Sequence, residues 1–137
     1  MYGKAIELFL VNGTADSLTT AELSNWNGKA IKIPRTEICG CDRDDIKGVG
    51  VYFLMCQEDD GTDSVYIGEA ENVVDRLTQH LRDYQSGKGK YYWNTAVIFV
   101  GRDLNKALIR YLENRFVEIA KDCGRYSVLT KNTYKNT

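Results

Sequence analysis

Short apolar blocks separated by polar turns predict most of the strands in this chain. Four blocks are rich in apolar and β-forming residues and are bounded by turn signals: "KAIELFLV", "GKAIKIP", "GVGVYFLMC" and "WNTAVIFVG". The polar "QEDDGTDS" after the third block predicts a hairpin loop, and "VYIG" is the returning strand. "RYSVL" near the end predicts a last short strand.

Helical periodicity appears in two later segments. From Ala70, apolar residues recur at helical spacing, with polar residues on the outer side: Ala70, Val73, Val74, Leu77 and Leu81. "DLNKALIRYLENRFVEIAKDCG" predicts a second helix, capped by Asp103 or Asn105 and ended by Gly124. Its core stripe is predicted to be Leu108, Leu112, Phe116 and Ile119.

Two earlier segments also predict helical structure. "SLTTAELSNW" is interpreted as a short helix or turn that starts near Thr19 or Thr20. "PRTEICGCDRDDIK" is interpreted as a helix with Pro34, the single proline, at its first position, although Gly40 weakens it.

Together these elements predict an α+β fold, a small mainly antiparallel sheet flanked by helices. We expect an N-terminal β/α extension at 1–47 packed on the core, a main domain at 48–130 and a tail at 131–137. The length of 137 residues fits one core.

Composition narrows the class of protein. Hydrophobic residues make up 43% and charged residues 27%, which are ordinary globular values. No apolar run approaches the roughly 20 residues needed to span a bilayer, so no membrane association is expected. The four cysteines have neither the spacing nor the nearby histidine of a zinc site, and reduced thiols indicate a cytoplasmic protein.

Charge is unevenly distributed although the net charge is only −1. Residues 48–87 carry a balance of −6, whereas residues 88–137 carry +6. A basic final third could present a stripe that faces phosphate, and solvated helix charges would explain the same counts.

Some residues could carry chemistry. Arg76 and His80 are four apart, beside the apolar stripe of their helix and near the strand with Tyr66. Glu113 lies on an apolar helix line, where a carboxylate is costly without a partner. It could pair with Arg110 or Arg115, lie exposed at the margin of the stripe, or bind a hard metal ion.

Two tripeptides and their downstream spacing resemble the GIY-YIG nuclease superfamily. "GVY" ends at Tyr52 and "YIG" begins at Tyr66; an arginine follows ten residues later and a histidine four residues beyond that. Glu113 in "RYLENRF" matches the glutamate of a later helix. The order from Gly50 to about Leu129 is similar to a stand-alone bacterial member, and to the nuclease domain of the incision subunit of bacterial excision repair, which implies a role in DNA repair.

The resemblance implies a metal-dependent endonuclease that hydrolyses phosphodiester bonds in DNA. It implies Mg²⁺ or Mn²⁺ held by Glu113, and Arg76 stabilising charge on the phosphate. Tyr52 or Tyr66 would position or deprotonate the attacking water, with His80 assisting. Gly50 and Gly68 would be backbone requirements close to the substrate.

Other residues are expected to contact DNA or to complete the site. The basic candidates for substrate binding are Lys88, Lys90 and Arg110. Many family members have an asparagine after the glutamate helix, where this chain has Ser127, and the nearby Asn132 could substitute for it. Excision-type members carry a lysine where this chain has Glu69.

These departures leave a second hypothesis open. The chain could be a weak or inactive module of the same fold that binds nucleic acid or a protein partner. In either case a further domain or partner could supply DNA affinity, because the net charge is close to neutral.

Overall fold

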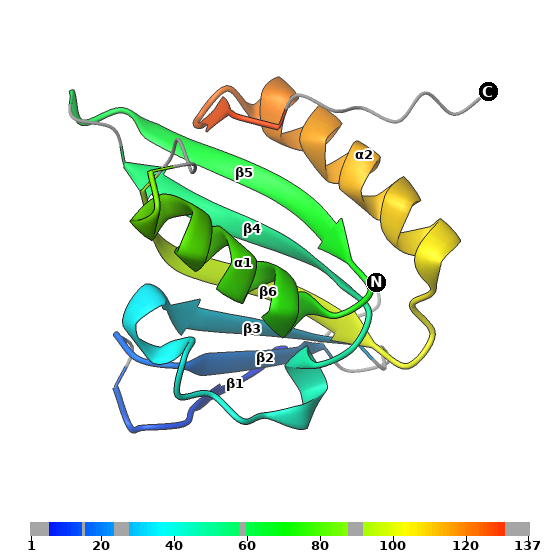
Figure 1. Ribbon diagram of the computed structural model, residues 1–137. Coiled ribbons are helices and arrows are strands. Elements are labelled where there is room, and N and C mark those ends of the chain that lie inside the picture. The colour runs from blue at the N-terminus through cyan, green and yellow to red at the C-terminus, as the bar shows by residue number, and fades with distance from the viewer. Residues whose placement is uncertain (1–5, 15, 24–27, 58–59, 88–91, 131–137) are drawn as a thin grey trace.

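The computed structural model describes residues 6–14, 16–23, 28–57, 60–87 and 92–130 (Figure 1). These residues form one sheet with a helix on each face. The strands are β1 (Ile6–Leu10), β2 (Thr19–Leu23), β3 (Gly28–Pro34), β4 (Gly50–Gln57), β5 (Asp63–Ala70), β6 (Trp93–Gly101) and β7 (Ser127–Val128). The α-helices are α1 (Val73–Gln85) and α2 (Lys106–Cys123), and two 3-10 helices, η1 (Arg35–Glu37) and η2 (Asp44–Ile46), follow β3.

The strand order in the sheet is β1-β2-β3-β6-β4-β5-β7. All neighbours are antiparallel except β5 and β7, which are parallel. The predicted α+β fold with a mainly antiparallel sheet is therefore confirmed. Because β7 pairs only with Ser64 and Val65, it does not continue along the rest of β5.

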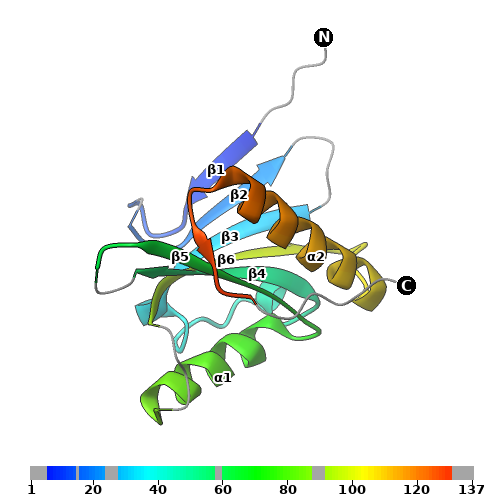
Figure 2. The same cartoon turned by 90° about the horizontal axis from the view of Figure 1, so that it is seen from above.

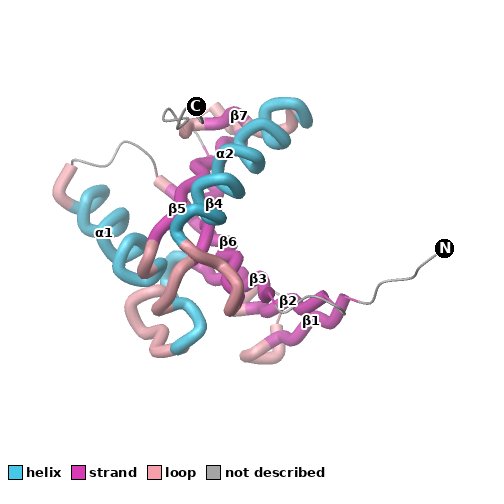
Figure 3. Tube along the Cα trace, turned by 90° about the vertical axis from the view of Figure 1, so that its right-hand side faces the viewer, coloured by secondary structure: helices cyan, strands magenta, loops and turns pink. Residues whose placement is uncertain are grey.

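Alternation along the central strands divides the sheet into two faces. Tyr52 pairs with Gly68, and Leu54 pairs with Tyr66. Since side chains alternate along a strand, both tyrosines point to the same face. Figure 3 shows α1 and α2 on opposite sides of the sheet, which Figure 2 also displays from above.

Each face has its own core. On the α1 side, Tyr52 and Leu54 join a cluster that includes Leu77, Trp93 and Ile98. On the α2 side, the buried cluster consists of Val51, Val65, Ile67, Ile109 and Val117. The tyrosines are thus on the α1 face, whereas α2 lies on the other face.

Two helix predictions near the N-terminus were wrong. The segment read as a helix or turn is strand β2, because Thr19 to Glu22 pair with both β1 and β3. Sheet pairing outweighed the weak local preference. The predicted helix from Pro34 consists of η1 and η2 instead, since Gly40 interrupts it and Ile38 and Ile46 enter the core separately.

The predicted ends of α2 are largely confirmed, but its buried stripe differs. Asn105 caps the first turn by accepting from the Leu108 amide at 2.8 Å, and Gly124 ends the helix at φ 68°. Leu108 and Ile119 are exposed, contrary to the prediction. The line facing the sheet contains Glu113, because its carboxylate finds a backbone donor there. It consists of Ile109, Glu113 and Val117.

None of the described helices is both long and apolar enough to cross a membrane.

Candidate functional site

The residues predicted to do chemistry lie around the C-terminal half of β5. Tyr52 comes from β4 and Tyr66 from β5, while Arg76 and His80 follow each other on α1. Glu113 approaches the same strand from α2. The site is therefore built from four elements on both faces of the sheet.

Tyr52 is held by two polar neighbours. Its side chain is 1% exposed, and its hydroxyl lies 3.0 Å from Nε2 of His80. The Arg76 guanidinium also donates a hydrogen bond to this hydroxyl. With the His80 proton on Nδ1, the Tyr52 hydroxyl can donate to Nε2 while its oxygen accepts from Arg76.

Gly68 provides the space for this phenol. A Cβ atom at position 68 would collide with the hydroxyl and Cζ of Tyr52. Gly50 is equally constrained, because a Cβ there would lie 2.6 Å from the Phe99 carbonyl oxygen on β6. Both glycines are required by packing inside the protein.

Three rings form one aromatic group on the α1 face. The Tyr52 and Tyr66 centroids are 6.3 Å apart in a stacked arrangement. The His80 ring meets both of them edge-on, at 5.7 Å and 5.3 Å. Tyr66 is only partly buried, so it is the tyrosine of this group with the greater access to solvent.

The environment favours neutral Tyr52 and neutral His80. Burial, and then the neighbouring Tyr66, raises the pKa of Tyr52 above its ordinary value, against the opposing effect of Arg76. Burial, and then the charge of Arg76, lowers the pKa of His80. An unprotonated Nε2 at neutral pH can accept the Tyr52 proton.

Glu113 is a buried carboxylate at the edge of β5. It is 5% exposed, and the backbone N–H of Glu69 donates a hydrogen bond to it. Burial, and then the charge of Glu69, raises the pKa of Glu113 to about 7, while Arg110 opposes the shift. Glu113 also raises the pKa of Tyr52, which places the two groups within electrostatic reach.

Thr130 completes the edge of β5 and had no signal in the sequence. Its hydroxyl accepts from the Ile67 amide at 2.7 Å and donates to the Ile67 carbonyl at 2.8 Å. The side chains of Thr130 and Glu113 thus satisfy successive outward-facing amides of β5, those of Ile67 and Glu69. The sequence pattern ended at the preceding strand, so it gave no reason to select Thr130.

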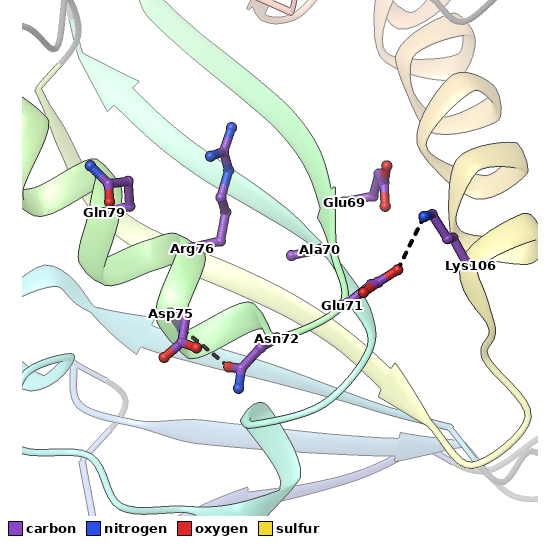
Figure 4. Close-up of a pocket in the computed structure, with 8 residues that line it drawn as sticks. All are labelled: Glu69, Ala70, Glu71, Asn72, Asp75, Arg76, Gln79 and Lys106. Atoms are coloured by element: carbon purple, nitrogen blue, oxygen red, sulfur yellow. Dashed lines mark hydrogen bonds and ion pairs between the residues drawn. The ribbon is translucent and has the colours of Figure 1, made fainter.

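An open pocket of about 470 Å³ lies beside this site. Figure 4 shows Arg76 on its α1 side and the Glu69 side chain directed toward α2. Lys106 lies 3.4 Å from Glu71 at its margin. The residues that line the pocket are Glu69, Ala70, Glu71, Asn72, Asp75, Arg76, Gln79 and Lys106.

The carboxylates of Glu113 and Glu69 are suitable ligands for a hard divalent cation. Mg²⁺ commonly uses one or two protein carboxylates and completes its shell with water and phosphate. Glu113 is a buried carboxylate whose pKa is raised further by the charge of Glu69, so added positive charge is favourable there. Among the described residues, no group of three or more acidic, histidine or cysteine side chains forms a preassembled cage.

The remaining predicted residues do not all belong to this site. Ser127 pairs with Ser64, five residues along β5 from Glu69 and about 17 Å away at the usual strand rise. Arg110 is exposed on α2 but acts on Glu113. Lys88, Lys90 and Asn132 lie outside the described residues. Arg115, a predicted pairing partner of Glu113, instead contacts Glu118 at 3.0 Å.

Comparison with known proteins identifies one family. The family model of the GIY-YIG catalytic domain matches residues 48–124, more than half of the chain. No curated protein and no solved structure matches the chain. The predicted similarity to the excision-repair subunit therefore stays a prediction.

Proposed function

This chain belongs to the GIY-YIG family, and from that premise we propose that it is a metal-dependent endonuclease that hydrolyses phosphodiester bonds in DNA. The observation that carries the proposal is the meeting of Arg76, the Tyr52–His80 hydrogen bond and buried Glu113 at one end of β5. Tyrosine, histidine, arginine and carboxylate supply the groups that phosphodiester hydrolysis needs.

Glu113 would hold a Mg²⁺ or Mn²⁺ ion, with Glu69 beside it. When bound, the ion supplies Lewis-acid activation of a phosphate oxygen. Arg76 stands exposed at the pocket and stabilises the negative charge that develops on the phosphate.

Tyr66 and Tyr52 have different roles toward the attacking water. Partly exposed Tyr66 orients the attacking water by a hydrogen bond. As the water attacks, its proton passes to the Tyr52 oxygen while the Tyr52 proton passes to Nε2 of His80. This route needs no free tyrosinate, which matters because burial raises the pKa of Tyr52.

The direct test is cleavage of supercoiled plasmid with Mg²⁺ or Mn²⁺ by wild type and Glu113→Gln. We expect the variant to cut at least about 10²-fold more slowly, as when other groups that stabilise transition-state charge are removed. Glu118→Gln is the matched control, because Glu118 is an exposed glutamate on the same helix. Equal cutting by wild type and Glu113→Gln would contradict the proposal.

The second candidate function is binding without cleavage, and Glu69 favours it. An acidic side chain in the pocket opposes the approach of phosphate. If this candidate is correct, wild type shows no metal-dependent cutting, and Glu69→Lys binds DNA more tightly than wild type. We also propose a role in DNA repair, a cytoplasmic location and a further domain or partner that supplies DNA affinity.

A further inference from the structure

A second aromatic group lies at the other end of α1, away from the residues discussed above. The Arg35 guanidinium lies 5.1 Å from the ring centroid of Tyr84, 4.7 Å from that of Tyr92 and 5.0 Å from that of Trp93. Tyr84 and Tyr92 meet edge-to-face at 5.4 Å. We refer to Arg35, Tyr84, Tyr92 and Trp93 as the aromatic platform.

One side of the platform is buried in the protein, and the other side is exposed to solvent. Trp93 is 1% exposed, and its carbonyl oxygen accepts a hydrogen bond from Arg35 at 3.3 Å. Tyr84 and Tyr92 remain 39% and 49% exposed. Packing alone does not require two tyrosines with this much free surface around one cation, so the open rings are available to a ligand.

The platform is on the same side of the sheet as the Tyr52 site. Trp93 belongs to the α1-side core, and Tyr84 follows His80 by one turn of α1. The eight residue steps from Arg76 to Tyr84 span about 12 Å of helix. This is about three to four nucleotide steps at the spacing of one strand of B-DNA.

We propose that Tyr84 and Tyr92 bind unpaired bases of a single DNA strand by stacking, while Arg35 contacts its phosphate backbone. The proposal rests on the proposed nuclease function, because it concerns the strand that extends from the scissile phosphate. It adds a second contact that the site around Tyr52 does not provide.

The chemistry of the platform favours nucleic acid over a protein partner. Exposed aromatic faces accept any base, and stacking contributes about 1–3 kcal/mol per base. Arg35 lies within reach of both rings, so one ligand can meet a cation and a π face together, as the alternating phosphates and bases of a single strand do. The distance along α1 then gives one strand access to both sites.

The test is binding of a fluorescein-labelled 12-mer of deoxythymidine, measured by anisotropy with a chelator present so that no cleavage occurs. Tyr84→Leu and Tyr92→Leu should each weaken binding by about 5- to 150-fold, because stacking is lost while apolar volume is kept. Tyr84→Phe should bind like wild type, since the ring is retained. Tyr111→Leu is the matched control, because Tyr111 is 55% exposed on α2, on the other face of the sheet.

Two further measurements make the result specific. A 12-base-pair duplex should be affected less than the single strand by the tyrosine variants, because its bases are already stacked. Thermal unfolding of each variant shows whether a loss of binding reflects a loss of folded protein. If Tyr84→Leu does not fold, the comparison is made with Tyr92→Leu and Tyr84→Phe.

Equal binding of the single strand by wild type and both leucine variants would overturn the proposal. So would an equal loss in Tyr111→Leu, or the absence of any single-strand binding. Failure of the nuclease proposal gives a different result: no metal-dependent cutting, with the tyrosine dependence of binding intact.

Discussion

At the scale of single residues, the absence of a side chain at position 68 decides where the Tyr52 ring lies. Tyr52 and Gly68 are paired across β4 and β5, and the phenol occupies the space that a Cβ would fill. The hydrogen bonds to His80 and Arg76 depend on that position. The glycine of "YIG" thus acts on the site through the tyrosine of "GVY".

Gly68→Ala should therefore disturb both stability and activity. We expect a loss of about 1–3 kcal/mol in the free energy of unfolding, typical of overpacking, measured by urea denaturation. Plasmid cutting should fall by at least about tenfold, because the phenol must move. Gly40→Ala serves as control, since nothing lies within 4 Å of its Cβ and its φ is not left-handed. Wild-type cutting by Gly68→Ala would show that Tyr52 does not need this position.

Glu113 should make stability depend on pH when metal is absent. Its folded pKa of about 7 exceeds the ordinary value of 4.5, so between these pH values the folded protein binds a proton that the unfolded chain has released. Stability from this group is complete below pH 4.5 and is lost as pH rises through 7.

Glu113→Gln removes that dependence and keeps an oxygen to accept from Glu69. With a chelator present, we expect the variant to be more stable than wild type at pH 8 by about 1–3 kcal/mol, and to show a smaller difference at pH 5. Urea denaturation at both pH values checks this. A variant less stable than wild type at pH 8 would contradict the expectation.

At the scale of elements, the structure around β5 separates what local signals could predict from what only tertiary contacts determine. The hairpin of β4 and β5 and the cap of α2 follow from local signals, which is why they were predicted. The side of α2 that faces the sheet could not be predicted from local signals. An equally good apolar stripe was available, formed by Leu108, Leu112, Phe116 and Ile119. Only the outward-facing amide of Glu69 shows why Glu113 turns toward the sheet.

Local signals in the sequence are also insufficient to predict β2 and the side-chain contacts of the site. The residues Thr19 to Glu22 have weak local preferences, and pairing with β1 and β3 makes them a strand. The motif spacing selected Tyr52, Tyr66, Arg76, His80 and Glu113, and the structure brings these side chains around one strand end. The tyrosine–histidine hydrogen bond depends on tertiary packing, so spacing could not specify it.

The edge of β5 gives a prediction about Thr130. Thr130→Val removes both hydrogen bonds to Ile67 while keeping nearly the same shape. We expect a loss of about 1–3 kcal/mol in the free energy of unfolding and faster hydrogen exchange at the Ile67 amide. Thr130→Ser keeps the hydroxyl and should restore slow exchange. Slow exchange in Thr130→Val would show that other groups protect this edge.

At the scale of the whole molecule, the part that matches the family does not contain the whole sheet. Strand β3 pairs with β6 along seven residues, Gly28 to Pro34, yet it precedes the matched segment. Ile31 and Ile33 are completely buried on the α1 side. We propose that residues 1–47 are an integral part of the fold, as an extension packed on the core.

A fragment of residues 48–130 should therefore fold poorly by itself. Losing the burial of Ile31 and Ile33 removes about 3–6 kcal/mol, a large part of the stability of a typical domain. It also leaves the β6 edge unpaired, which favours aggregation. Circular dichroism and sedimentation of this fragment, compared with residues 28–130, test the prediction. A monomeric, cooperatively unfolding 48–130 fragment would contradict it.

The way α2 meets β5 also has a consequence for synthesis of the protein. Tyr52, Tyr66, Arg76 and His80 leave the ribosome well before Glu113, and Thr130 follows later still. A nascent chain that has folded its hairpin and α1 still lacks the carboxylate at the strand edge. The proposed nuclease site is therefore complete only once α2 has been synthesised, and a ribosome that stalls after α1 releases a chain without the proposed metal ligand.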